Sequence, residues 1–284
     1  MNTEHAIVLR GRVLRPGAGP FVVGVLNVTP DSFSDAGRFY DARVAIEAGA
    51  RMADEGADVV DIGGESTRPG SAAVLPNEQI RRTQPVIAEL TKRFGRDGPA
   101  ISIDTRSAAV ARAALDAGAT IINDISALRD DPDMVSLVAD RGAGVVLLHM
   151  KGTPADMQIN PAYDDAVGDI RGFLAERIES VTSAGVARER IVVDPGIGFG
   201  KTTEHNLEII RRVGEFHSLG VPIMLGPSRK RFIGQVLGIE QPADRLMGTM
   251  AAVAAAILAG VEMVRVHDVA AARQVADMGA AIRG

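Results

Sequence analysis

The chain has 284 residues, of which 46% are hydrophobic and 24% are charged, a composition typical of a soluble globular protein. Its net charge of −5 argues against a nucleic-acid-binding surface, and 4% aromatic residues with no Trp leave little for single-stranded bases to stack on. The absence of cysteine excludes a disulfide framework and thiolate chemistry.

The amino-terminal stretch MNTEHAIVLRGR lacks the apolar core of a signal peptide. The Ala-rich stretch 250–260 is too short to span a bilayer. We therefore expect a cytoplasmic protein with neither a membrane nor a nucleic acid as partner.

Residues 1–20 form an extension before the main body of the chain. Two short apolar runs, Ala6–Leu9 and Val13–Leu14, flank Arg10-Gly11, which predicts a small β-hairpin that closes one end of the core.

Eight short apolar runs follow, rich in β-branched residues, and each predicts a buried strand that ends in polar residues. They are Phe21–Leu26 before Asn27, Ala57–Val60 before Asp61, Ala100–Ile103 before Asp104, Ile121-Ile122 before Asn123, Gly144–Leu148 before His149, Ile191–Val193 before Asp194, Val221–Leu225 before Ser228-Arg229-Lys230, and Val261–Val264 before Arg265 and His267.

Segments with helical periodicity separate these runs, such as Asp41–Glu55 and Asp164–Ala184. Eight alternating strand–helix units predict an α/β fold, a (β/α)8 TIM barrel in one domain spanning 1–284. A doubly wound open sheet is the alternative. It is disfavoured because no GxGxxG follows the first strand and no composition shift marks a second domain.

In a barrel, the carboxyl ends of all strands meet at one face. Taken singly, each polar strand end is more often a turn or cap; Asp194, for example, precedes Pro195 and could make an Asx turn. Their convergence instead predicts one pocket surrounded by Asn27, Asp104, Asn123, Asp194, Lys230, Arg265 and His267.

The residue types in this pocket suit two kinds of ligand group. Carboxylates and an Asn can pair with a planar heterocycle that bears amide and amidine groups, whereas the cations and Asn27 suit a diphosphate. His149 and His267 do not form a ligand-spaced metal cluster. Two long loops, Thr29–Tyr40 and Glu65–Gly70, are either substrate loops at this face or solvated connections.

Several strings carry a resemblance to a known family. With GVLNVTPDSFSDAG (24–37), DIGGESTRPG (61–70), ISIDTR (101–106), INDIS (122–126), HMKGTPADMQ (149–158), DPGIGFGK (194–201), PSRKRF (227–232) and RVHDV (265–269), the chain resembles the dihydropteroate synthases, pterin-binding enzymes of folate biosynthesis that sulfonamides inhibit. The resemblance runs from Phe21 nearly to the end.

The resemblance implies a TIM-barrel transferase that joins 6-hydroxymethyl-7,8-dihydropterin diphosphate to p-aminobenzoate and releases pyrophosphate. It implies a cationic carbon that Asp35, on a mobile first loop with Phe33, could stabilise, and a homodimer formed through the last helices. By the same resemblance, the pterin-binding residues are Asp104, Asn123, Asp194 and Lys230; the p-aminobenzoate site is Thr67, Arg68, Pro69, Phe199 and Lys230; the diphosphate site is Asn27, Arg265 and His267; the Mg2+ ligand is Asn27; and the catalytic residues are Asp35, Lys230, Arg265 and His267.

Arg231 departs from the family pattern, which often has Ser beside the p-aminobenzoate carboxylate. Our hypothesis is that Arg231 either turns outward or adds a second cation that alters sulfonamide affinity. Neither Ser66 nor Ser228 has a His at the spacing of a nucleophile motif. Two other functions stay open from the residues: a methyl-tetrahydrofolate methyltransferase, and a non-catalytic paralogue that binds pterin or acts only as a scaffold.

Overall fold

The computed structural model describes residues 6–9, 11–29, 42–66 and 73–284. Eight strands form one parallel sheet: β3 (Phe21–Asn27), β4 (Val59–Gly63), β5 (Ala100–Asp104), β6 (Ile121–Asp124), β7 (Gly144–Leu148), β8 (Ile191–Asp194), β9 (Met224–Leu225) and β10 (Met263–Val266). The α-helices are α2 (Ala42–Asp54), α3 (Pro76–Phe94), α4 (Ala108–Asp116), α5 (Met134–Arg141), α6 (Ala166–Ser183), α7 (Thr203–Arg211), α8 (Arg231–Leu237), α9 (Leu246–Leu258) and α10 (Val269–Arg283).

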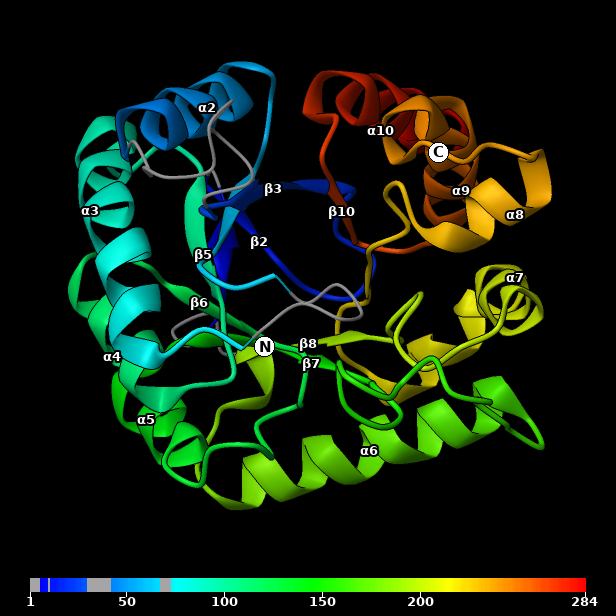
Figure 1. The fold of residues 1–284 in the computed structure, drawn as a ribbon, viewed down its shortest axis with the longest axis horizontal. Helices are drawn as coiled ribbons and strands as arrows, with labels where there is room; N and C mark the ends of the chain where they lie inside the picture. The colour runs from blue at the N-terminus through cyan, green and yellow to red at the C-terminus, as the bar shows by residue number, and fades with distance from the viewer. Residues whose placement is uncertain (1–5, 10, 30–41, 67–72) are drawn as a thin grey trace.

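The sheet runs β8-β7-β6-β5-β4-β3-β10-β9 and then meets itself. The two ends of this order are joined by a parallel bridge between Val193 and Ile223 and by the Val193 amide, which donates to the Pro222 carbonyl at 2.9 Å. Figure 1 shows the helices as a ring around the strands. The predicted (β/α)8 barrel is confirmed, and the open sheet is not.

Strand boundaries differ from the sequence prediction mainly in β4 and β10, which both start two residues later than predicted, and in β9, which starts three residues later. The prediction ended β4 and β10 at Val60 and Val264, but Asp61 and Arg265 lie within them. Charged side chains are tolerated there because they pair with each other inside the barrel.

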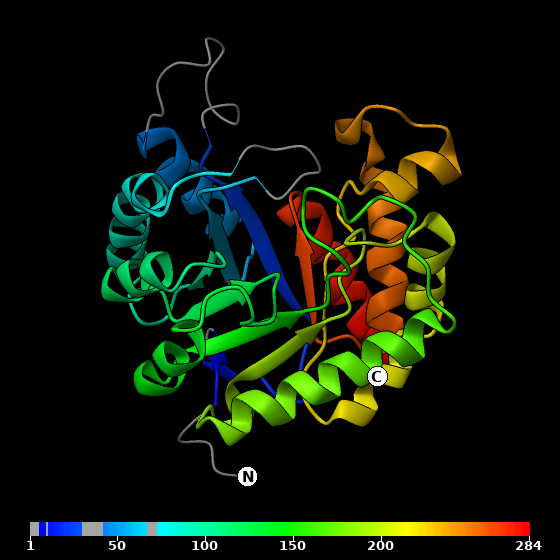
Figure 2. The same ribbon diagram turned by 60° about the horizontal axis from the view of Figure 1, so that its bottom comes forward.

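The predicted hairpin at the start of the chain is confirmed. Strand β1 (Val8–Leu9) pairs antiparallel with β2 (Arg12–Val13), and it lies at the lower end of the barrel in Figure 2. Its buried side chains Ile7 and Leu9 belong to a cluster with Phe21 and Met263, near the starts of β3 and β10. The hairpin therefore closes the amino-terminal end of the barrel interior.

Apolar side chains fill both the interior of the barrel and the layer between the sheet and the helices. The larger buried cluster lies between the sheet and the helices and includes Ile62, Ile103 and Val264 from three strands. Burial of the apolar surface of these side chains is the main stabilising contribution to folding. Among the helices of the described residues, none is both long and apolar enough to cross a membrane.

Candidate active site

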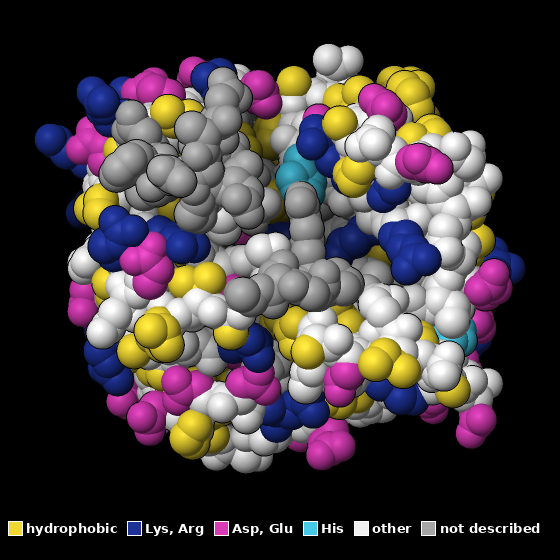
Figure 3. All heavy atoms as spheres, in the orientation of Figure 1, with side chains coloured by type: hydrophobic (Ala, Val, Ile, Leu, Met, Phe, Trp, Pro, Cys, Tyr) yellow, Lys and Arg dark blue, Asp and Glu magenta, His cyan; other side chains and the backbone are white. Residues whose placement is uncertain are grey.

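The polar strand ends lie together at the carboxyl-terminal face of the barrel. A methyl group on Gly63 would lie 3.6 Å from the Asp104 side chain and 3.7 Å from the Asn27 amide oxygen, so these two side chains flank the same glycine. In the same way, Gly226 lies between Arg265 and Asp194. Figure 3 shows Lys, Arg and His side chains gathered beside the centre of this face.

Arg265 connects the acids on neighbouring strands. Its Nε lies 2.6 Å from Oδ2 of Asp61, and its Nη2 lies 2.8 Å from Oδ2 of Asp104. The Asn123 amide donates to the same Asp61 oxygen at 2.9 Å. Although burial opposes its charge, Asp61 and Asp104 raise the pKa of Arg265. One continuous polar network thus spans β4, β5, β6 and β10.

Asp61 is the residue that the sequence analysis left out of the site. It is 1% exposed and accepts hydrogen bonds from both Arg265 and Asn123. The signal that could have found it is the two-residue period of a strand. Val59, Asp61 and Gly63 alternate in β4, and Val59 packs in the barrel interior.

Two acceptor atoms of this network have no partner among the described residues. Both Asp61 Oδ1 and Asn123 Oδ1 are buried without a hydrogen bond. Buried polar atoms are usually paired, so unpaired acceptors mark places where a ligand or water donates. The two side chains line the same small cavity inside the barrel. This side of the pocket therefore favours a ligand that carries N–H donors.

The acids of the pocket hold their protons more tightly than free carboxyls do. Burial raises the pKa of Asp194 to about 6, against the hydrogen bond that the Gly196 amide donates to its Oδ1 at 2.7 Å. Burial also raises the pKa of Asp104, while Arg265 acts in the opposite direction. Both groups are thus poised to respond to the charge of a ligand.

Lys230 and Phe199 form another wall of the pocket. Lys230 is the residue before α8, and its Nζ lies 4.1 Å from the centre of the Phe199 ring. Burial and the Arg265 guanidinium lower the pKa of Lys230 to about 8. Gly198 allows this approach, because a side chain there would meet Lys230 Cδ at 3.0 Å.

Ser228 has a histidine partner in space, although none at the spacing of a motif. No sequence spacing links Ser228 to a histidine, yet Ser228 Oγ lies 2.9 Å from Nδ1 of His267, because β9 and β10 are neighbours in the sheet. The adjacent Arg229 forms an ion pair with Asp268 at 2.6 Å. The pairing is a relation between strands, which sequence distance does not reveal.

Four of the predicted site residues lie outside the described residues, namely Asp35, Thr67, Arg68 and Pro69, and so does Phe33 of the first loop. Arg231 is the first residue of α8 and is exposed, which agrees with the outward-turned alternative of our hypothesis.

The described residues contain no cluster of three His, Cys, Asp or Glu side chains that could hold a metal ion. Asn27 offers a single amide oxygen at the pocket. Mg2+ often takes only one or two oxygen ligands from the protein and completes its shell with phosphates and water, so this donor fits that ion with a diphosphate present.

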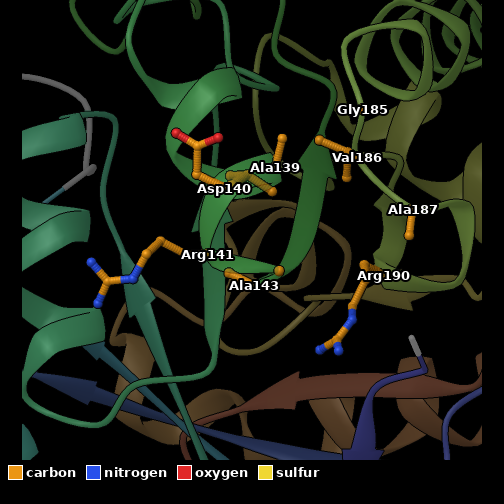
Figure 4. A pocket seen from close by; sticks show the side chains of 10 residues that line it. Ala139, Asp140, Arg141, Ala143, Gly185, Val186, Ala187 and Arg190 are labelled. Carbon is orange, nitrogen blue, oxygen red and sulfur yellow. The ribbon is translucent and has the colours of Figure 1, made fainter. Parts of the chain in front are cut away.

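A larger cavity, of about 410 Å3, lies at the opposite end of the barrel, before β7 and β8. In Figure 4, Ala139, Val186 and Ala187 border it, and the side chain of Arg141 extends to the left while that of Arg190 extends downward. It contains none of the strand-end residues and is a gap between turns rather than the candidate site.

Comparison with known proteins agrees with this geometry. Residues 23–267 match a family described as pterin binding enzyme. A dihydropteroate synthase from Synechocystis is 43% identical over 266 residues, covering 94% of this chain and 91% of that protein. The solved Xanthomonas albilineans dihydropteroate synthase in complex with 7,8-dihydropteroate is 41% identical, with a TM-score of 0.86 over 96% of this chain and 97% of that one. A Yersinia pestis dihydropteroate synthase solved with a sulfonamide drug is 39% identical, with a TM-score of 0.89 over 98% of both chains.

Proposed function

The chain belongs to the pterin-binding enzyme family, and from that premise we propose how its pocket performs the reaction of a dihydropteroate synthase. This transferase of folate biosynthesis condenses 6-hydroxymethyl-7,8-dihydropterin diphosphate with p-aminobenzoate to give 7,8-dihydropteroate and pyrophosphate, and it is a sulfonamide target. The observation that carries the proposal is the convergence of strand ends on one pocket, where Asn123 and Arg265 both bond Asp61 and Asp194 lies across Gly226 from Arg265.

The pterin ring fits the acceptor side of the pocket. Its amidine-like N–H groups would donate to Asp194, while the unpaired acceptors of Asp61 and Asn123 take further ring donors. A buried carboxylate that accepts two N–H bonds gives both affinity and orientation. Asp104 and Lys230 complete the set around the ring.

The diphosphate fits the cationic side. Arg265 and His267 would bind its oxygens, and Asn27 would hold Mg2+ against it. When bound, Mg2+ stabilises the charge of the departing pyrophosphate. Because Arg265 is also paired with Asp61 and Asp104, it connects the ring-binding acids to the leaving group and aligns the carbon between them.

The second substrate fits the Phe199–Lys230 wall. The aromatic ring of p-aminobenzoate can pack on Phe199, with Lys230 nearby as the cation. Thr67, Arg68 and Pro69 would complete this subsite. The arylamine is a neutral nucleophile that needs positioning more than deprotonation, so no dedicated base is required. Asp35 would stabilise the cationic carbon that develops as pyrophosphate leaves.

A homodimer in the cytoplasm is part of the same proposal. Exposed apolar side chains on the last helices support a two-fold contact there, because Met247 and Met278 are 77% and 63% exposed.

An endpoint assay tests the function. Purified protein is mixed with the pterin diphosphate, p-aminobenzoate and Mg2+, and dihydropteroate is detected by mass. We expect product in the full reaction and none with EDTA or with Lys230→Ala. Absence of product from a protein that still binds pterin would contradict the proposal and would direct the next assay to methyl-tetrahydrofolate.

A further inference from the structure

Lys201 is a buried cation outside the pocket. It is 3% exposed and lies in the loop that joins β8 to α7. Its Nζ lies 3.0 Å from Nδ1 of His149, 2.9 Å from the Phe199 carbonyl oxygen and 3.3 Å from the His149 carbonyl oxygen. Burial lowers the pKa of Lys201 well below its usual value, but the three acceptors around Nζ match the three hydrogens of an ammonium and favour the charged form.

The contact with His149 determines the tautomer of the imidazole and occupies one donor of Lys201. Burial and the Lys201 charge lower the pKa of His149 to about 2, so the imidazole is neutral. With Lys201 as donor, Nδ1 of His149 accepts, and the ring proton is on Nε2. Because all its donors are used, Lys201 has none left for a substrate.

These contacts join the end of β7 to the loop after β8. The backbone of this loop is held at several points: the Gly198 amide by Asn206, the Gly198 carbonyl by Gln158, and the Gly200 carbonyl by Tyr163. The Phe199 carbonyl, between them, is held by Lys201. Lys201 thus holds the Phe199 carbonyl, while the Phe199 amide donates to the Gly196 carbonyl at 3.0 Å.

Phe199 in turn faces the pocket. Its ring lies under Lys230 Nζ at 4.1 Å and packs with Ile125, Met150 and Met157. We propose that Lys201, through His149 and the Phe199 carbonyl, is a positioning residue that fixes the Phe199 ring against Lys230 and thereby sets affinity for the arylamine substrate. The inference rests on the proposed function for the role of that wall, but the placement of the ring is independent of it.

Steady-state kinetics on three variants of the full chain test the proposal. Lys201→Met removes the cation and keeps most of the side-chain volume. His149→Leu removes the side-chain acceptor, whereas His149→Asn retains an acceptor oxygen near the position of Nδ1. We expect Lys201→Met and His149→Leu to raise KM for p-aminobenzoate about tenfold, with kcat and pterin diphosphate affinity within about threefold of the parent, and His149→Asn to retain most of the parent KM.

A spectroscopic measurement separates the positioning role from the function. The chain has no tryptophan, so Phe199→Trp introduces a single reporter at this wall. Adding Lys201→Met should lower the anisotropy of that tryptophan and shift its emission to longer wavelength. This readout needs no turnover, so it stands even if the parent protein forms no dihydropteroate.

Two results would overturn the inference. One is an unchanged KM for p-aminobenzoate in Lys201→Met together with an unchanged tryptophan signal. The other is an equal loss of kcat, pterin affinity and p-aminobenzoate affinity, which is the mark of general destabilisation. If Lys201→Met does not fold, as judged by loss of a cooperative thermal transition, the two His149 variants decide. Equal KM values for p-aminobenzoate in His149→Leu and His149→Asn would then reject the positioning role of Lys201.

Discussion

Ser228 Oγ lies 2.9 Å from Nδ1 of His267 and accepts a hydrogen bond from the His267 backbone amide at 3.1 Å. Burial and Arg265 lower the pKa of His267 to about 4, so the ring is neutral at pH 7. Since the hydroxyl already accepts from the amide, it can donate its own proton to Nδ1, which leaves the ring proton on Nε2. Ser228 thus orients a neutral His267 ring whose Nε2–H can donate to the diphosphate.

Ser228→Ala should therefore weaken binding of the pterin diphosphate. Loss of one hydrogen bond of about 0.5–1.5 kcal/mol predicts a rise in its KM of roughly two- to tenfold. KM for p-aminobenzoate should not change. Steady-state kinetics with each substrate varied in turn measure both values, and Ser218→Ala, at an exposed serine, is the matched control. A change confined to p-aminobenzoate would contradict the assignment of His267 to the diphosphate.

Asp194→Ala should remove the charge-assisted contact to the pterin ring. The expected loss is about 2–4 kcal/mol of binding free energy, measured by calorimetry with the pterin diphosphate. Because the pKa of Asp194 is about 6, the carboxylate takes up a proton as pH falls from 7 to 5, and pterin affinity of the parent protein should decrease over that range. An affinity unchanged by the substitution would refute the role of Asp194.

Although it should also weaken pterin binding, Asp194→Asn should increase the stability of the free protein. The pKa of Asp194 is about 6 in the folded protein and about 4 in the unfolded chain. The buried, charged carboxylate therefore lowers the free energy of unfolding above pH 6. This destabilisation disappears as the pH falls towards about 4, because the carboxyl is then protonated in the folded protein. Asn keeps an acceptor for the Gly196 amide without the charge. We expect the variant to be more stable than the parent at pH 8 by on the order of 2 kcal/mol, with the difference gone near pH 4.

Urea denaturation at several pH values measures this difference, and Asp116→Asn, at an exposed ion pair, is the control. A difference independent of pH would mean that the Asp194 carboxylate is not responsible.

The sequence predicted the barrel because strand and helix periods are local properties, and β–α alternation determines which ends of the strands meet. It placed Asn123 and Asp194 in the pocket for the same reason. It missed the role of Asp61 because the strand was taken to end at Val60, whereas Arg265, 204 residues away, neutralises the Asp61 charge within the strand. The Ser228–His267 pair is likewise a contact between neighbouring strands. Pairings of this kind depend on register and side-chain geometry, which local patterns do not contain.

At the amino-terminal end, Asp58→Asn should reduce stability without affecting the reaction. This 3% exposed carboxylate accepts from the Val22 amide at 2.8 Å, from Arg12 at 3.0 Å and from Arg273 at 3.2 Å, and so joins the hairpin, β3 and α10. Losing charge-assisted bonds at a buried site predicts a decrease of about 2–4 kcal/mol in the free energy of unfolding. Urea denaturation measures the decrease, with Asp116→Asn again as the exposed control. A raised KM in the folded variant would show that the two ends of the barrel are coupled.

Gly196→Ala should damage the pocket more than any other alanine in the loop after β8. Gly196 has φ of +74°, and a Cβ there would lie 2.0 Å from the His149 carbonyl oxygen, which is backbone and cannot rotate away. Gly142 has φ of +57° with nothing within 4 Å of its Cβ position, so Gly142→Ala carries only the conformational cost of about 1 kcal/mol. We expect Gly196→Ala to lose clearly more stability than this control, because the loop must move away from β7.

In any folded fraction, that movement displaces both Asp194 and Phe199, so affinities for pterin and p-aminobenzoate should fall together. Thermal unfolding and calorimetry on the two variants measure these effects, and equal losses of stability would mean that the close approach to His149 relaxes without cost.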